Sequence, residues 1–358
     1  YAPKLPINKY MLNIIYRLYI IAHIERIAIM AESRKLQQTG GSTLIVSLPK
    51  KWINKNKLKA GSEVRLRKQS DGTMNIDPGK SDTTKKTSIV QCNDEESQHL
   101  FRDLIGVYLA GATEIKVLGN PRLTVKERKT IRKFSASVIG LEIIEEEAAQ
   151  AMLTDMSNPG ALPFRTAIKR LYKIVSAMYN DSILILEGAD DLAADVVDRD
   201  KEADKLQWFI ERQFNMMLEN TSLSRELKAS SFEGVIYSNV ARYLERIADH
   251  ACRLAEIGYI AGLIPGRKML PLAKDAGEIM EKAMKSFINN DPRKATVVID
   301  KGKKSVKKAQ TYFENRYKKE MEHPLEFSIA MDAIMRTIAY STDISEATIN
   351  YAAKKENK

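Results

Sequence analysis

The stretch Asn239-Val240-Ala241-Arg242-Tyr243-Leu244-Glu245-Arg246-Ile247-Ala248-Asp249-His250-Ala251 decides how the larger part of this chain folds. Its apolar residues recur every three or four positions, and the stripe continues beyond both ends. The stripe consists of Ile236, Val240, Tyr243, Ile247, Ala251 and Leu254. This spacing gathers them on one side of a helix. We therefore expect a long amphipathic helix that buries this side against other helices.

Helical periodicity extends from this stretch in both directions, over residues 161–355, and is broken by turn signals. The breaks are Glu187-Gly188, Asn220-Thr221-Ser222, Pro265-Gly266, Asn289-Asn290-Asp291-Pro292 and His323-Pro324. Five breaks leave six helices. They predict a helical bundle.

An internal repeat divides this bundle. Its markers are Asp200 with Asp300, Arg246 with Arg336, and Glu256 with Glu346. The pairs predict two copies of a three-helix unit, residues 161–264 and 268–355.

The composition excludes several classes of protein. The 358 residues carry 57 Lys and Arg against 46 Asp and Glu, a net charge of +11, and 44% are hydrophobic. These values exclude disordered, collagen-like and disulfide-scaffold proteins. Cys92 and Cys252 belong to no CxxC pair, and the four histidines are scattered. We expect a cytoplasmic protein without a thiolate zinc site, and the sequence offers few ways to build histidine-based catalysis.

Residues 1–30 stand apart from the remainder. The apolar stretch 11–30 is interrupted by Arg17, His23, Glu25 and Arg26, so it does not meet the requirement for a membrane-spanning helix. We expect no integral membrane segment. Met30 is the expected start, and residues 1–30 are interpreted as an upstream extension. The alternative is an amphipathic helix that docks on a partner or a membrane surface.

Residues 31–80 predict a small, basic β module with strands over 43–48 and 63–67. Eight Lys and three Arg oppose four acidic residues, which gives 11 − 4 = +7. Such a concentration of charge indicates a nucleic-acid partner. The alternative is a lysine-rich solubilising surface.

The order of motifs in this module resembles that of the AbrB/MazE/SpoVT swapped-hairpin DNA-binding domain. The motifs are Arg34-Lys35-Leu36, Thr39-Gly40-Gly41-Ser42, Leu44 to Leu48, Pro49-Lys50-Lys51-Trp52-Ile53 and Leu58-Lys59-Ala60-Gly61-Ser62-Glu63-Val64. The resemblance implies a homodimer in which two chains interleave hairpins into one β-barrel that binds double-stranded DNA. It also implies the DNA contacts Arg34, Lys35, Lys50 and Lys51. Gly40-Gly41-Ser42 departs from the Gly-Gln pair usual in the family.

Residues 86–155 alternate between strand and helix patterns. Strands are expected at 88–91, 114–118 and 141–145, and helices at 95–109 and 124–138. The pattern predicts a small α/β layer without a Gly-rich phosphate loop. We interpret it as a spacer or dimerisation module.

Two pairs of carboxylates in the first helical unit are candidate metal ligands. Asp200 with Asp204, and Glu245 with Asp249, are each four residues apart and therefore share a helix face. Two such pairs on facing helices would form an oxygen-rich cage for Mg²⁺, Mn²⁺ or iron. The alternative is that they pair with neighbouring Arg and Lys on a solvated face.

The helix 239–251 is similar to the signature helix of the PhoU family, phosphate-uptake regulators built from two tandem three-helix units. In this family Glu/Asp-x-x-x-Asp motifs bind multinuclear metal clusters. The resemblance implies iron, manganese, magnesium or zinc at Asp200, Asp204, Glu245 and Asp249. It also implies phosphate-transport or signalling proteins as partners.

The second unit departs from this pattern. Lys304, Met335 and Ala339 stand where the first unit has Asp204, Glu245 and Asp249, and only Asp300 matches. We expect no metal cluster there. The segment 301–320, with eight basic and two acidic residues, is interpreted as a solvated basic face or a surface for DNA or another anionic partner.

Together the patterns predict a mainly α protein with an AbrB-like β-barrel, a small α/β module and a tandem three-helix bundle. The predicted function is that of a transcriptional regulator of phosphate uptake. The alternative is a PhoU-type adaptor that acts on proteins without binding DNA. A carboxylate-bridged metalloenzyme is disfavoured, because ferritin-like sites use a pair of Glu-x-x-His motifs and the helical part contains no such pair.

Overall fold

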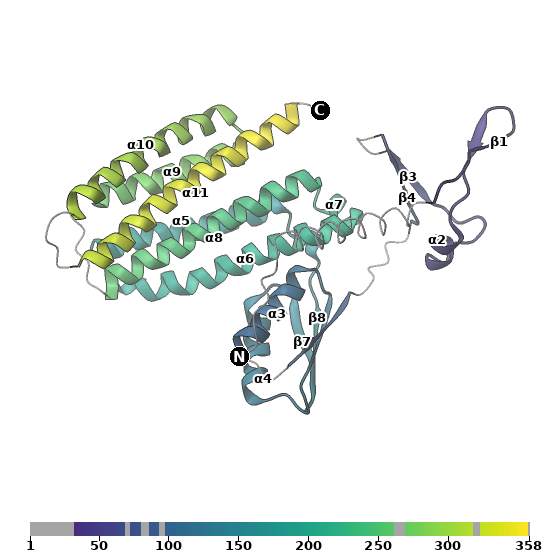
Figure 1. Cartoon of the computed structure of the whole chain (residues 1–358), viewed down its shortest axis with the longest axis horizontal. Helices are drawn as coiled ribbons and strands as arrows, with labels where there is room; N and C mark the ends of the chain where they lie inside the picture. Colours follow the sequence, from purple (N-terminus) through teal and green to yellow (C-terminus); the bar gives the residue numbers. More distant parts are fainter. Residues whose placement is uncertain are drawn as a thin grey trace, which may run out of the picture. The chain divides into compact units, whose positions relative to one another are not determined.

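The computed structural model describes residues 32–68, 72–79, 86–92, 97–260, 269–317 and 323–356. The chain forms two compact units, Tyr1–Thr83 and Thr84–Lys358 (Figure 1). The expected extension, residues 1–30, lies outside the described residues.

The first unit consists of two antiparallel hairpins and a short helix. Strands β1 (Gln37–Thr39) and β2 (Thr43–Ile45) form one hairpin, and β3 (Arg65–Lys68) and β4 (Met74–Asp77) form the other. Helix α2 (Lys50–Lys55) comes between the two hairpins in the chain and begins directly after Pro49. Strand β2 ends before the predicted boundary at residue 48, because the pairing with β1 ends at Gln37 opposite Ile45.

The second unit begins with a mixed four-stranded sheet. Its strands are β5 (Thr87–Gln91), β6 (Glu114–Leu118), β7 (Leu141–Glu146) and β8 (Gln150–Asp155), in the order β5-β6-β8-β7. Only β5 and β6 pair in parallel. Strand β8 was not predicted; it returns from β7 and lies between β7 and β6.

Two helices complete this α/β layer. They are α3 (Ser97–Leu109) and α4 (Val125–Ser137), and α4 begins at a capping box formed by Thr124 and Glu127. Their apolar sides share a core with the sheet that includes Leu104, Phe134 and Leu153.

The remainder of the second unit is a bundle of long helices that lie side by side (Figure 1). The first group is α5 (Phe164–Leu186), α6 (Ala193–Glu219), the short α7 (Thr221–Glu226) and α8 (Ser231–Ile260). The second is α9 (Met269–Asn289), α10 (Pro292–Tyr317) and α11 (Pro324–Glu356). Helix α7 was not predicted; the Asn220 side chain accepts a hydrogen bond from the Ser222 N–H and caps it. The predicted break at Pro265-Gly266 lies outside the described residues.

Helix α8 is central to the bundle and contacts α5, α6 and α11. Within its predicted stripe, Val240, Ile247, Ala251 and Leu254 are fully buried and Ile236 nearly so, while Tyr243 is half-buried. Burial of the stripe fixes the rotation of α8, so the carboxylates on another side of this helix have defined neighbours. The prediction of a mainly helical protein is confirmed.

Helix α6 also holds the α/β layer, through the buried Arg212. Its Nη1 donates to the Tyr108 carbonyl at 2.5 Å, and Nη2 donates to the Ala112 carbonyl at 2.8 Å and to Asp155 Oδ2 at 2.6 Å. The guanidinium also lies 4.5 Å from the centre of the Tyr108 ring. One side chain thus satisfies acceptors on three segments of the layer and ties α6 to it.

Candidate functional site

The four carboxylates predicted as metal ligands gather where α6 meets α8. Burial raises the pKa of Asp204 to about 7, with repulsion from Asp200 and Asp249 acting in the same direction. Burial likewise raises the pKa of Glu245 to about 7; the charge of Asp249 raises it further, as do Asp204 and Asp200 of α6. Each group therefore senses charges on the opposite helix. The two pairs face one another as the spacing predicts.

Asp200 is half-buried in this cluster. Its Oδ1 is buried and has no hydrogen-bond partner within the described part of the chain. Burial raises the pKa of Asp200, and the charges of Asp249 and Glu256 raise it further. A buried carboxylate oxygen without a partner is unfavourable unless a cation or donor reaches it.

Cys252 and Glu256 also border the cluster, although the sequence analysis did not assign them to it. Burial raises the pKa of the Cys252 thiol, and the adjacent Asp200 carboxylate raises it further. Both residues follow Asp249 at helical spacings of three and seven, which place them on the same side of α8. That spacing could have identified them.

Arg246 is the cation beside the cluster. Its Nε lies 3.6 Å from Glu245 Oε2, and its Nη1 lies 3.4 Å from Asp249 Oδ2. The arginine side chain is 53% exposed, so these ion pairs contribute little to stability. One arginine against Asp200, Asp204, Glu245 and Asp249 leaves an excess of three negative charges when all four are ionised.

The chemistry of this cluster fits a cation, while a ligating geometry is not formed. Carboxylate oxygens are the ligands that Mg²⁺, Mn²⁺ and iron prefer, and the unpartnered Asp200 oxygen lacks a positive neighbour. Among the described residues, however, no three His, Cys, Asp or Glu side chains converge closely enough to hold one ion. Ligation would require the side chains to adopt other rotamers.

In the second helical unit only one of the four corresponding positions, Asp300, is acidic, and Lys304 replaces Asp204. Asp300 is exposed, and the next residue, Lys301, pairs with Asp275 at 2.6 Å and with Glu278 at 3.2 Å. Lys304 is exposed on the same helix. Like charges repel, so a cation would be disfavoured here.

The predicted DNA contacts lie on the surface of the first unit. Lys50 and Lys51 occupy the first turn of α2 and are exposed, as is Lys35. Arg34 forms an ion pair with Glu32. The side chains are accessible to a phosphate backbone.

The described residues of the first unit do not form a buried core. None of its described residues, 32–68 and 72–79, is buried. Apolar side chains are exposed instead: Leu36 63%, Leu44 60%, Leu66 60% and Met74 62%. Exposed apolar side chains of this kind are typical of interaction surfaces.

Comparisons with known proteins agree with both resemblances. Residues 168–258 match the family model of the PhoU domain, and residues 37–84 match the model "Antidote-toxin recognition MazE, bacterial antitoxin". Among solved structures, PhoU from Pseudomonas aeruginosa is similar at 16% identity and a TM-score of 0.44, covering 54% of this chain and 96% of that chain. No curated protein sequence matches.

The matched ranges contain six of the eight candidate residues, and Arg34 and Lys35 precede the range 37–84. The first includes all four carboxylates, and the second includes Lys50 and Lys51. Both are regulatory rather than enzymatic domains, and a PhoU domain implies signalling in phosphate regulation. No helix in the described ranges is long and apolar enough to cross a membrane. The chain therefore carries a MazE-type domain near its N-terminus and a PhoU domain in its helical part.

Proposed function

We propose that this protein is a DNA-binding transcriptional regulator of phosphate uptake that acts in the cytoplasm. Its MazE-type domain binds double-stranded DNA. Its PhoU domain senses the phosphate state or receives a signal from transport or signalling proteins. The two domain matches support this division: the MazE-type domain would bind DNA, and the PhoU domain would receive the signal.

The observation that carries this proposal is that the described residues of the first unit do not form a buried core. A domain of about 50 residues is marginal even with a core, so a β unit that buries none of its described residues needs a partner surface. A second copy that interleaves its hairpins would cover Leu44 and Leu66. The proposed homodimer follows from this requirement.

Dimerisation also concentrates the basic contacts. Each copy supplies Arg34, Lys35, Lys50 and Lys51, so a dimer presents 2 × 4 = 8 cations to the DNA. Phosphate contacts of this kind position a protein on the duplex and release counterions. With about eight contacts, affinity should fall about 10³- to 10⁵-fold between about 50 and 200 mM salt.

The PhoU domain supplies the second part of the proposal. Asp200, Asp204, Glu245 and Asp249 would hold iron, manganese, magnesium or zinc. A bound cation would offset the repulsion that raises the pKa of Asp204 and Glu245. It would thereby hold α6 against α8.

The test is fluorescence anisotropy of a labelled mixed-sequence duplex with the full chain across a salt series. Lys50→Ala/Lys51→Ala removes four contacts per dimer, so we expect the salt slope to fall by about 3–4. The matched control is Lys169→Ala/Lys173→Ala, which removes two exposed lysines from α5. Salt-insensitive binding, or equal loss in both variants, would instead support the adaptor that acts only through proteins.

A further inference from the structure

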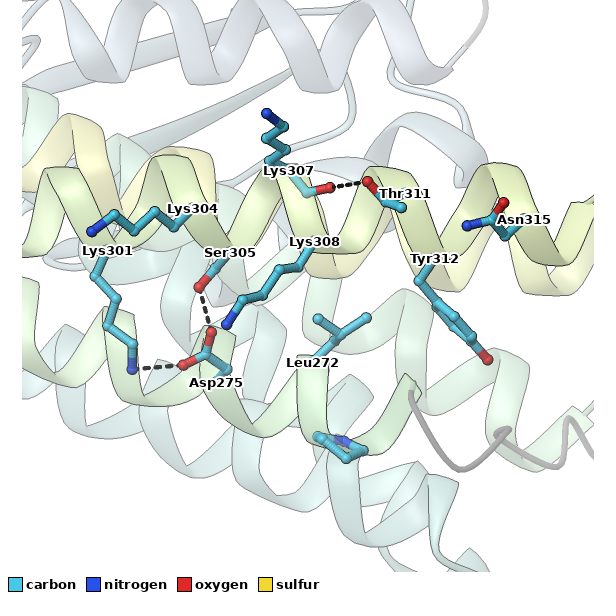
Figure 2. Close-up of a pocket in the computed structure, with 11 residues that line it drawn as sticks. Leu272, Asp275, Lys301, Lys304, Ser305, Lys307, Lys308, Thr311, Tyr312 and Asn315 are labelled. Carbon is cyan, nitrogen blue, oxygen red and sulfur yellow. Dashed lines mark hydrogen bonds and ion pairs between the residues drawn. The ribbon is translucent and has the colours of Figure 1, made fainter.

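A groove of about 860 Å³ lies along the second helical unit, between α9 and α10 (Figure 2). Pro271, Leu272 and Asp275 line it from α9. Its α10 wall includes four lysines and, further along, Thr311, Tyr312 and Asn315. Its volume is within the range of pockets that bind small organic ligands. It is remote from the carboxylate cluster of α6 and α8 in sequence and has no role in the proposed DNA binding.

One end of the groove is strongly cationic. Lys301, Lys304, Lys307 and Lys308 line it, and their spacing places them on neighbouring rows of one helix. Asp275 is the one acidic side chain of the lining, so the balance is 4 − 1 = +3. Within the described residues, neither Lys304 nor Lys308 forms an ion pair.

Asp275 is already neutralised by its own partners. It pairs with Lys301 at 2.6 Å and accepts a hydrogen bond from the Ser305 hydroxyl (Figure 2). The pairing also holds Lys301 in place at the wall. The charge of Lys308 also acts on Asp275: although burial opposes it, the hydrogen bonds from Lys301 and Ser305 and the charges of Lys301 and Lys308 hold the pKa of that carboxyl below its usual range. An anion that enters the groove would still meet the ammonium groups of Lys304 and Lys308, which form no ion pair among the described residues.

The other end is apolar and aromatic. Tyr312 projects from α10 on the side of Leu272, and Asn315 follows one turn later (Figure 2). The Tyr312 ring is held edge-on against Phe327, with the ring centres 5.9 Å apart and an angle of 77°. A fixed aromatic ring beside an aliphatic wall is suited to a flat apolar body. Asn315 adds an amide that can donate and accept hydrogen bonds.

We propose that this groove binds a nucleotide, with its phosphates at Lys304 and Lys308 and its base along Leu272 and Tyr312. Two features favour this class of ligand. The charge is confined to one end, which matches a molecule with an anionic tail and a planar body. Inorganic phosphate would leave most of the volume and the entire apolar end unused. A DNA backbone or an anionic membrane would need charge along the whole surface.

The binding experiment uses the full chain, a fluorescent ADP analogue, and unlabelled ADP, ATP, adenosine and pyrophosphate as competitors. We expect saturable binding in which ADP and ATP compete better than either adenosine or pyrophosphate. Lys304→Ala/Lys308→Ala should weaken ADP binding at least about tenfold, because two charge-assisted hydrogen bonds to the phosphates are lost. The control Lys285→Ala/Lys303→Ala removes two exposed lysines of α9 and α10 outside the groove and should retain affinity within about twofold.

Tyr312→Leu tests the apolar end. It should weaken ADP binding about three- to tenfold and leave pyrophosphate binding unchanged, because the lost contact is aromatic. Circular dichroism confirms that each variant is folded. Lys50→Ala/Lys51→Ala should bind ADP normally, which keeps this result separate from DNA binding.

Three results would overturn the proposal. The first is no saturable nucleotide binding by the folded wild-type chain. The second is equal competition by ADP and pyrophosphate, which would indicate a simple anion patch. The third is loss of binding to DNA or to phosphatidylglycerol vesicles in Lys304→Ala/Lys308→Ala with nucleotide binding unchanged.

Discussion

The two helical units use the same face of their second helix in different ways. When Asp200 is aligned with Asp300, Trp208, Arg212 and Asn215 of α6 match Lys308, Tyr312 and Asn315 of α10. In the first helical unit this face of α6 packs against the α/β layer. Trp208 lies 6.5 Å from the Phe101 ring, and the Asn215 amide donates to the Leu109 carbonyl at 2.9 Å. In the second unit the matching residues line an open groove.

The charges of the two units differ in the same manner. The first helical unit has four carboxylates between α6 and α8. In the second helical unit, Lys301 pairs with carboxylates of α9, and Lys304 is exposed. Under the two proposals, one repeated scaffold presents a cation site in its first copy and an anion site in its second. The side chains decide the sign of the ligand, and the neighbouring layer decides which face is open.

The largest expected effect is at Arg212, whose matched position is Tyr312. Arg212→Met leaves Asp155, whose side chain is 4% exposed, without its cation, so the free energy of unfolding should fall by about 3–5 kcal/mol. Tyr312→Leu should cost about 1 kcal/mol or less, because that ring is only half-buried. Urea denaturation measures both. An equal loss of unfolding free energy at the two positions would contradict the proposed difference between α6 and α10.

An intermediate effect is expected for metal retention. Glu245→Ala/Asp249→Ala should reduce the metal content of the purified chain to background while the helical content is retained, because two of the four proposed ligands are lost. Elemental analysis by mass spectrometry after loading with iron, manganese, magnesium or zinc measures it. The control Asp190→Ala/Asp191→Ala removes two exposed carboxylates between α5 and α6. Metal content that is unchanged in the first variant would place the ions elsewhere.

The smallest effect concerns the pH dependence of stability in the presence of a chelator. Because Asp204 and Glu245 have a pKa of about 7 when folded and lower values when unfolded, the folded chain holds protons that the unfolded chain has released. Their contribution therefore lowers stability as the pH rises from about 4 to about 7. Glu245→Gln should be about 1–2 kcal/mol more stable than wild type at pH 8, with a smaller difference at pH 5.

Thermal unfolding with and without metal separates the effect of charge repulsion from the effect of losing a metal ligand. Without metal, Glu245→Gln removes repulsion and should raise the melting temperature. With metal, the same change removes a ligand and should lower the gain that the ion provides. A variant that is less stable than wild type under both conditions would contradict the electrostatic account.

Local patterns predicted much of the fold. The stripe of α8 marked a buried side, and the Gly, Asn and Pro signals at 187–188, 220–222, 289–292 and 323–324 coincide with helix ends. Strand β8 was missed because Gln150–Asp155 carries no turn signal that separates it from β7. Helix α7 was missed because Asn220-Thr221-Ser222 marks a turn equally well. Short elements depend on pairing and packing more than on propensity.

The candidate site, too, was predicted only in part from the sequence. Four-residue spacing placed each carboxylate pair on one helix face, since helix geometry is local. Helical spacing also places Cys252 and Glu256 on the side of Asp249, but only the packing of α8 against α6 brings them near Asp200. The groove required the packing of α9 against α10. The short turn at 289–292 predicts that the two helices are neighbours, but it does not specify which of their sides leave a groove open.

The sequence by itself determined the amphipathic helices, the carboxylate spacing and the basic character of the first unit, because these follow from residue types at short range. Only the tertiary structure decided that Arg212 is buried while Tyr312 lines a groove. Both residues occupy the same position of a repeated helix. Their burial differs because the α/β layer packs against α6, and burial depends on neighbours that are distant in the chain.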